Sequence, residues 1–438
     1  MNKSFEKSTQ ANKRLQDLIP GGAHTYAKGE DQYPFEMAPV ISHGNGAHVW
    51  DVDGNEYVEY GSGLRAVSLG HAHPRVLEAV RRELDHGSNF VRPSIVELRA
   101  AERFLETVPT AEMVKFAKGG SDVTTAAVKL ARAVTGRARV AVCSDHGFFS
   151  IDDWFIARTP MDAGIPGAIG DLTVGFPYGD LAATEELFRR YDGEIACLIL
   201  EAATQQDPPA GYLQGLKDLA HRYGALLIFD EMITGFRWSA AGAQAVYGVT
   251  PDLSTFGKAL GNGFAVSALA GRRDVMERGG LRDTRERVFL LSTTHGAETH
   301  ALAAAMAVMD VYAEEDITAR LHERGERLTA GVRQVAAAAG VGEHVVVRGR
   351  PSNLVFATLD ENYVPSQEYR TLFLRGLIDG GVIGPSFVVS AALTDADIDK
   401  TVEAVANACA VYRKALDAGD VRPFLLGRPV KPVFRTYV

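Results

Sequence analysis

The chain has 438 residues, of which 46% are hydrophobic, and its formal net charge is −9. This length allows two or three domains, and the composition is that of a soluble globular protein with a substantial core. The net negative charge, with no basic patch to offset it, argues against a nucleic-acid-binding protein.

The N-terminal region opens on a polar, amphipathic segment, and Gly21 and Gly22 predict the end of its helix. It has no apolar core of signal-peptide length, and no stretch of the chain is apolar enough to span a membrane. We therefore expect a cytoplasmic protein without a membrane partner. Residues 46–60, "GAHVWDVDGNEYVEY", alternate apolar and polar side chains around an Asp-Gly turn, which predicts a β-hairpin.

Strands and helices alternate from about residue 95 onward. The periodicities predict helices over 95–108, 121–135, 212–224, 298–314, 317–339 and 395–416, and strands over 113–117, 139–143, 196–201, 225–231 and near 345–359. The first four of these strands are apolar on both faces, which indicates a mostly parallel sheet covered on both sides. We expect a large α/β domain over 76–325 and a small α+β domain over 326–438, with residues 1–75 packing against the small domain.

Three features fall at carboxyl ends of the predicted strands, where open α/β sheets bind ligands. The first is Gly119-Gly120-Ser121, between a strand and a helix. Free backbone N–H groups and the helix dipole make this place suited to a phosphate, although Ser121 could instead simply cap the helix.

The second feature is Asp230, which with Glu231 ends the very apolar strand "LLIFDE". A carboxylate there is costly without a cationic or hydrogen-bonding partner, although it could serve only to cap a loop. The third feature is Lys258, a lone cation among small residues in "STFGKALGNGF". Such a lysine can approach a ligand closely and form a Schiff base, whereas an ordinary lysine is an exposed surface residue.

Together the phosphate site, the buried carboxylate and the isolated lysine are what pyridoxal 5′-phosphate (PLP) needs. The chain has neither a GxGxxG sequence after a strand nor a GxxxxGK[ST] sequence, so dinucleotide and P-loop cofactors lack support. We expect no metal site, because His71 and His73 lack a third ligand and the three cysteines match no zinc spacing.

Over nearly its whole length the sequence resembles the class III (omega) aminotransferases of PLP fold type I, the aspartate aminotransferase-like fold, in the branch that includes glutamate-1-semialdehyde 2,1-aminomutase. The motifs that carry this resemblance are "IPGGAHTY" (19–26), "WDVDGNEYVEYGSG" (50–63), "LGHAHPRV" (69–76), "LARAVTGR" (130–137), "IFDEMITGFR" (228–237), "PDLSTFGKALGNGF" (251–264) and "AALTDADID" (391–399).

The resemblance implies a role for residues in and around these motifs. Lys258 is the Schiff-base lysine and also carries a proton between carbon atoms, Asp230 pairs with the pyridine nitrogen, and Met232 packs under the ring. The phosphate loop is implied at Gly119, Gly120 and Ser121, ring stacking at Phe148, and a contact with the neighbouring subunit's phosphate at Thr293. The implied assembly is therefore a homodimer with shared active sites.

The sequence also departs from the aminomutase pattern. Leu64 and Arg65 stand in place of a tryptophan and a glycine, and Arg92 begins "RPS" in place of "APT". Pro385 stands in place of a glutamate. We therefore expect an ordinary transaminase, which passes an amino group from an amino acid donor such as glutamate to an aldehyde or ketone. By association with such departures, we expect a role in sugar or secondary-metabolite biosynthesis.

Arg65 and Arg92 are candidate substrate residues, because either guanidinium could bind an anionic group of the substrate; either could equally face solvent or pair with a nearby acid. Two alternative functions remain open. One is an aminomutase or another PLP isomerase, such as a racemase or epimerase. The other is a non-catalytic PLP-fold binding protein.

Overall fold

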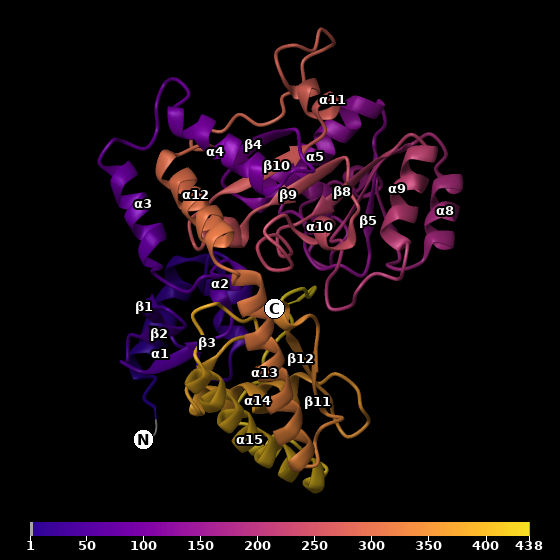
Figure 1. Cartoon of the computed structure of the whole chain (residues 1–438). Coiled ribbons are helices and arrows are strands. Elements are labelled where there is room, and N and C mark those ends of the chain that lie inside the picture. The colour runs from indigo at the N-terminus through magenta and orange to yellow at the C-terminus, as the bar shows by residue number, and fades with distance from the viewer. Residues whose placement is uncertain (1–2, 438) are drawn as a thin grey trace. The chain divides into compact units, whose positions relative to one another are not determined.

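The computed structural model describes residues 3–437 and divides into two compact units. One unit comprises Met1–Leu64, Leu69–His73 and Ala319–Val438, and the other comprises Arg65–Ser68 and Pro74–Thr318. Most helices and strands of both are labelled in Figure 1. Between residues 3 and 437, no helix combines the length and apolarity needed to cross a membrane.

A seven-stranded sheet forms the centre of the second unit, in the order β4-β10-β9-β8-β7-β5-β6. Its strands are β4 (Met113–Ala117), β5 (Arg139–Cys143), β6 (Thr173–Phe176), β7 (Ile195–Leu200), β8 (Leu226–Asp230), β9 (Leu253–Phe256) and β10 (Ser267–Gly271). Neighbours run parallel from β9 to β6, whereas β10 is antiparallel to both β4 and β9. The mostly parallel sheet predicted from the apolar strands is confirmed.

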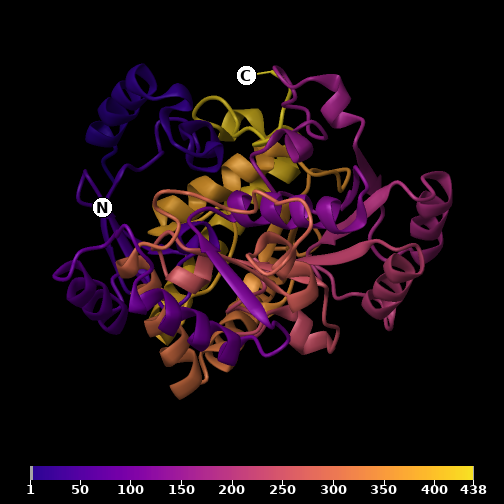
Figure 2. The same ribbon diagram turned by 90° about the horizontal axis from the view of Figure 1, so that it is seen from above.

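Helices cover both faces of this sheet. Val140 and Ile199 point to the face covered by α5 (Gly120–Thr135), whereas Leu198 and Phe229 point to the face covered by α8 (Leu181–Arg190) and α9 (Tyr212–Arg222). The helices α8 and α9 lie side by side in both views (Figure 1, Figure 2). Because side chains alternate between the two faces, β7 and β8 are buried along their whole length, which explains their unbroken apolar sequences.

The remaining elements of the second unit surround this core. They are α3 (Pro74–Leu84), α4 (Ile95–Thr107), α6 (Asp153–Ile156), α7 (Gly167–Gly170), α10 (Ala243–Tyr247), η4 (Lys258–Gly261), α11 (Arg273–Met276), η5 (Glu277–Gly279) and α12 (Thr299–Glu314). The helices predicted over 95–108 and 298–314 are therefore confirmed as α4 and α12, with α12 packed against α3 and α4.

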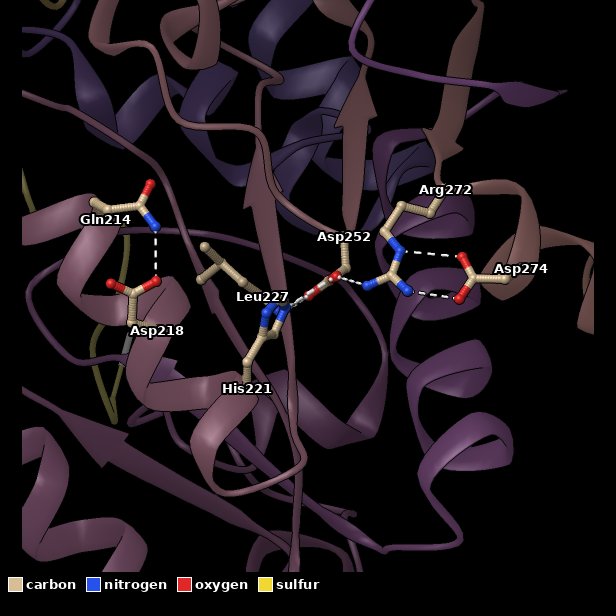
Figure 3. A network of polar contacts seen from close by, with 7 residues as sticks. All are labelled: Gln214, Asp218, His221, Leu227, Asp252, Arg272 and Asp274. Atoms are coloured by element: carbon tan, nitrogen blue, oxygen red, sulfur yellow. Dashed lines mark hydrogen bonds and ion pairs between the residues drawn. The ribbon is translucent and has the colours of Figure 1, made fainter.

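The buried aspartate Asp252 links the amino ends of β8 and β9 by hydrogen bonds. Asp252 directly precedes β9 and is fully buried. Its carboxylate accepts a hydrogen bond from the backbone N–H of Leu227 at 2.8 Å and binds His221 at 2.9 Å and Arg272 at 2.5 Å (Figure 3). Arg272 also binds Asp274, and Gln214 binds Asp218 in the same view. The network ties α9, β8 and the end of β10 together.

The first unit holds a four-stranded sheet in the order β1-β2-β3-β13. The strands are β1 (Ile41–Asn45), β2 (His48–Asp51), β3 (Glu56–Glu59) and β13 (Val382–Ile383). β2 and β3 pair antiparallel around the Asp-Gly turn, so the predicted hairpin is confirmed. Because β13 pairs parallel with β3, residues from the two ends of the chain share one sheet.

Helices and a second hairpin complete the first unit. They are α1 (Glu6–Leu18), η1 (Pro20–Gly22), η2 (Tyr26–Lys28), η3 (Glu30–Gln32), α2 (Ser62–Arg65, the junction with the second unit), α13 (Ile317–Ala338), β11 (Val345–Arg348), η6 (Pro351–Asn353), β12 (Val355–Thr358), α14 (Gln367–Asp379), α15 (Asp395–Ala418) and η7 (Arg422–Phe424). Figure 1 shows α14 beside α15, in agreement with their extensive contact. The predicted helices over 317–339 and 395–416 are confirmed.

Candidate active site

Three neighbouring strands end in line at the carboxyl edge of the large sheet. Leu200 of β7 pairs with Phe229 of β8, and Asp230 pairs with Thr255 of β9. The residue after Leu200 is Glu201, so Glu201 and Asp230 are the next in-register pair beyond the end of β7. Neighbouring strands lie about 4.8 Å apart, and in-register residues point to the same face. This edge therefore brings two carboxyl groups close together.

Asp230 is 2% exposed and ends β8. Its Oδ1 accepts hydrogen bonds from the backbone N–H of Met232 at 2.9 Å and from Thr255 Oγ1 at 3.2 Å. Oδ2 has no hydrogen-bond partner among residues 3–437. Burial raises the pKa of Asp230 to about 6, and the cation of Lys258 opposes this rise. The carboxylate therefore keeps one oxygen available for a cationic ligand.

Lys258 follows β9 and begins η4. Its φ of 44° is in the left-handed region, which is strained for a residue with a side chain and is found most often at functional sites. The side chain is partly buried, and within the described chain Nζ makes no hydrogen bond or ion pair. Burial lowers the pKa of Lys258, while Asp230 and Glu201 act in the opposite direction. The lowered pKa suits the amine to act as a base or nucleophile.

Met232 fills a space that two glycines leave open. A Cβ atom on Gly120 would lie 3.0 Å from Met232 Sδ, and one on Gly257 would lie 2.6 Å from it. The sulfur therefore packs directly on the backbone of the α5 N-terminus and of the residue before Lys258. This packing brings the ends of β4, β8 and β9 together around one buried side chain.

The predicted phosphate loop lies at the N-terminus of α5. Gly119 is the N-cap residue, and its N–H donates to Asp122 Oδ2 at 2.7 Å. Ser121 does not cap the helix, because its Oγ accepts the N–H of Ile151 at 3.0 Å. The loop thus presents a helix N-terminus beside Met232, at the same edge as Asp230 and Lys258.

Three other predicted residues lie in exposed positions. Phe148 is 45% exposed and contacts the edge of Phe155, with the ring centroids 5.6 Å apart. Thr293 is exposed in the long segment before α12, and Arg92 is exposed before α4. None of the contacts described for Arg92 within residues 3–437 reaches Lys258 or Asp230. Their proposed roles in stacking, in a partner's site and in substrate binding stay predictions.

Arg65 differs from Arg92 because its guanidinium interacts electrostatically with other residues of the site. Its φ is 71°, another left-handed backbone position, and its carbonyl oxygen accepts a hydrogen bond from Arg237 at 3.4 Å. Burial lowers the pKa of Arg65, and the carboxyl group of Glu201 opposes this. The same guanidinium lowers the pKa of Lys258. Arg65 therefore stands within electrostatic reach of Glu201 and Lys258.

Two buried residues of the site were missed from the sequence. Glu201 is 7% exposed, and its backbone N–H donates to Nδ1 of His146 at 3.1 Å. His146 is also 7% exposed, and its Nε2 has no hydrogen-bond partner among the described residues. Glu201 follows the apolar strand "IACLIL" just as Asp230 follows "LLIF", so the reasoning applied to Asp230 could have found it.

The family model "Aminotransferase class-III" matches residues 26–408, so the chain belongs to the class III aminotransferase family. Enzymes of this class use PLP, and the predicted enzyme class and cofactor are therefore confirmed.

Relatives of known sequence and structure agree with this. The glutamate-1-semialdehyde 2,1-aminomutase of Desulforamulus reducens is 33% identical, with 93% of this chain and 98% of that protein covered. The crystal structure of an omega-transaminase from Sphaerobacter thermophilus is similar with a TM-score of 0.79 and 28% identity, covering 94% of this chain and 97% of that one. The structure of the FumI protein of Sphingopyxis sp. MTA144 has a TM-score of 0.86 at 24% identity, covers 96% of this chain and 100% of that one, and supports the fold.

The residues at the sheet edge fit this cofactor. Within the described residues, Asp230 Oδ2 accepts no hydrogen bond and Lys258 Nζ has no partner, and Met232 packs on the backbone at Gly120 and Gly257. No group of three or more His, Cys, Asp or Glu side chains suited to a metal ion occurs among residues 3–437.

Proposed function

We propose that the chain is an aminotransferase that moves an amino group from an amino acid donor such as glutamate to an aldehyde or ketone. The observation that carries the proposal is the meeting of Lys258 and Asp230 at one sheet edge, each with a polar atom left unpaired by the described chain. An unpaired charged group with little access to water is costly unless a ligand completes it. The family membership identifies that ligand as PLP.

Three of the chain's groups would hold the cofactor. Asp230 Oδ2 would accept a hydrogen bond from the ring nitrogen, and Met232 would lie against the ring. The N-terminus of α5, at Gly119–Ser121, would bind the phosphate through its N–H groups and dipole. When bound, PLP takes up the substrate's amino group and withdraws electrons from the carbon that carried it.

Lys258 would carry the proton in this reaction. Burial and the guanidinium of Arg65 lower the pKa of its amine, so that Nζ can accept a proton from the substrate carbon and return it elsewhere. The strained backbone at Lys258 supports this role, because such strain persists only where the surrounding structure holds the residue in place.

Arg65 would bind an anionic group of the substrate. A guanidinium pairs with a carboxylate through two parallel hydrogen bonds, and a partly desolvated one does so more strongly than a surface arginine. The carboxyl group of Glu201 is within electrostatic reach of Arg65.

An aminomutase is the second candidate, because curated relatives at 32–33% identity carry that name. An aminomutase must retain its intermediate within one site, and the changes at Leu64, Arg65, Arg92 and Pro385 depart from its pattern. These departures favour the transaminase.

A homodimer with shared active sites would complete the enzyme. Four apolar side chains are more than half exposed on and just before the first turns of α4: Phe90, Val91, Ile95 and Leu98. A second copy of the chain would cover them, and Thr293 would reach the phosphate of the partner subunit. Sedimentation velocity of the holoenzyme should give a single species of twice the chain mass, whereas a monomer with full activity would contradict the shared site.

A half-reaction distinguishes the two candidate functions. The PLP-loaded enzyme is mixed with one amino donor at a time, beginning with glutamate, and the visible spectrum is followed without an acceptor. A transaminase should convert its cofactor to the amino form with one donor and recover it only after a carbonyl compound is added. Multiple turnovers of a single substrate without any acceptor would instead support the aminomutase or another PLP isomerase.

A further inference from the structure

Two carboxyl groups lie next to each other at the centre of the proposed active site. Glu201 and Asp230 follow the last in-register pair of β7 and β8, and they are 7% and 2% exposed. Within residues 3–437, the carboxyl oxygens of Glu201 have no hydrogen-bond partner. Two buried carboxylates on neighbouring strands cannot both ionise readily, because each charge opposes the other in a medium that solvates neither.

The surroundings divide the proton unequally between the two groups. Asp230 has two hydrogen-bond donors that favour its charged form, at Met232 and Thr255. Glu201 has none, so burial and the charge of Asp230 raise the pKa of Glu201 to about 8, compared with about 6 for Asp230. Lys258 and Arg65 lower the pKa of Glu201, and Glu231 raises it further.

The nearby histidine adds no charge that would reverse this division. Nδ1 of His146 accepts the backbone N–H of Glu201, and burial lowers the pKa of His146 to about 4. The imidazole is therefore neutral at physiological pH, and its bond holds the backbone at Glu201 in place.

We propose that Glu201 is a positioning residue that holds the proton of a Glu201–Asp230 carboxyl pair, so that the single negative charge stays on Asp230. The proposal rests on the proposed function for its consequence, because the charge on Asp230 is what the ring nitrogen of PLP requires. Ionisation of Glu201 at alkaline pH adds a second negative charge beside the cofactor, which stabilises protonated forms of nearby nitrogen atoms.

Glu231 provides a matched control. It is also fully buried, and it follows Asp230 directly. In contrast to Glu201, its carboxylate accepts the backbone N–H groups of Ala243 at 2.7 Å and Gln244 at 2.8 Å and a hydrogen bond from Thr234. These bonds hold the loop between β8 and α10, so Glu231 has a structural role.

The first arm of the test uses the apoprotein and does not depend on catalysis. The unfolded chain loses the Glu201 proton near its ordinary pKa of 4.5, whereas the folded chain keeps it up to about pH 8. Between these values the folded state binds the extra proton, so its stability falls as pH rises, and the unfolding constant increases about tenfold per pH unit from this group. Glu201→Gln should lack this contribution. The difference between the pH dependence of unfolding in the wild type and in the variant therefore measures it.

The second arm follows the visible spectrum of the PLP-loaded enzyme against pH. The spectral transition is the pH at which the cofactor's visible spectrum changes halfway. Glu201→Gln should move it to lower pH by about one pH unit, because the variant cannot supply the second negative charge. Glu231→Gln should lower the stability and shift the transition much less than Glu201→Gln does. If Glu201→Gln yields no folded protein, Glu201→Leu fills a similar volume and serves both arms.

The outcomes separate this inference from the proposed function. If the free energy of unfolding of Glu201→Gln changes with pH as steeply as that of the wild type, the carboxyl pair is overturned. If Glu201→Gln loses the pH dependence of stability but keeps the wild-type pH of the spectral transition, the positioning role is overturned. It is also overturned if Glu231→Gln shifts the pH of the spectral transition as much as Glu201→Gln does. Failure of the amino-donor half-reaction, with the slope and the spectral shift both present, overturns the proposed function and leaves the pair in place.

Discussion

Asp230 and Asp252 lie at opposite edges of the same sheet and differ in how their charge is satisfied. Both are almost completely buried, at the carboxyl end of β8 and at the amino end of β9. Asp252 binds His221, Arg272 and the N–H of Leu227, so that both of its oxygens are used (Figure 3). Asp230 uses one oxygen for two neutral donors and leaves the other unpaired by the described chain.

The difference separates a structural carboxylate from a functional one. Burial alone makes a charge costly, and the chain offsets this at Asp252 with a cation and two further donors. At Asp230 the chain leaves the compensation incomplete, and among the described residues the same edge holds the Glu201 carboxyl group without a hydrogen bond and Lys258 Nζ without a partner. A buried charge whose hydrogen-bond and ionic partners are incomplete, more than burial itself, identifies the edge that binds a ligand.

The largest expected effect comes from Lys258→Ala. Without the amine no group at this edge can bond to the cofactor or move the proton, so transamination should fall by roughly a thousandfold or more. The fold should persist, because Met232 and the glycines around it are unchanged. Turnover and the visible spectrum measure the effect, and wild-type turnover in this variant would place the functional lysine elsewhere.

The next effect concerns Arg65, with Arg92 as its matched control. Arg65→Gln should raise KM for an anionic amino donor about tenfold to a hundredfold, because a charge-assisted hydrogen bond contributes about 1.5–3 kcal/mol. It should barely change the rate with a neutral amine. Steady-state kinetics of both variants decide the question: equal effects of Arg65→Gln and Arg92→Gln on the anionic donor would remove Arg65 from the substrate site.

The affinity for PLP should depend on pH through Asp230. Its pKa is about 6 in the folded apoprotein. Binding to the ring nitrogen requires the charged carboxylate, so below pH 6 affinity should fall by about tenfold per pH unit from this group. The difference between wild type and Asp230→Asn in equilibrium titrations isolates the contribution, since the phosphate titrates equally in both. A difference independent of pH between 5 and 7 would show that Asp230 does not pair with the cofactor.

The smallest effect on turnover is expected for Asp252→Asn. The variant weakens bonds to His221 and Arg272, and hydrogen bonds to charged groups contribute about 1.5–3 kcal/mol to stability. Urea unfolding should show a loss of that size, while turnover per folded molecule stays at the wild-type value. A large loss of turnover with unchanged stability would reverse the distinction between the two edges.

Much of the fold was predictable because a strand that is buried on both faces has an uninterrupted run of apolar residues. "IACLIL" and "LLIFD" indicated parallel strands covered on both faces, and the Asp-Gly turn indicated the hairpin of β2 and β3. The strands β6, β9 and β10 were not predicted. β9 and β10 consist partly of small and polar residues, "LSTF" and "SALAG", whose burial depends on neighbouring strands.

The site was predictable where a residue type is unusual in its local context. Lys258 among small residues and Asp230 after an apolar strand both satisfy this condition. His146 gave no such signal, because its importance lies in a bond to the backbone of Glu201, 55 residues away in the chain. The electrostatic reach of Arg65 to Glu201 and Lys258 likewise depends on tertiary structure, since the sequence offered no reason to separate it from Arg92.

The most direct test of the distinction between the two aspartates is the rate of the first half-reaction in Asp230→Asn and Asp252→Asn. Each variant is loaded with PLP and mixed with a saturating amino donor in a stopped-flow spectrophotometer. Asp230→Asn should be slower than the wild type by about a hundredfold or more, because a preorganised charge at the reacting ring is lost. Asp252→Asn should react at the wild-type rate. Equal rates in the two variants, or a slower reaction in Asp252→Asn, would contradict the assignment of the active site to the carboxyl edge.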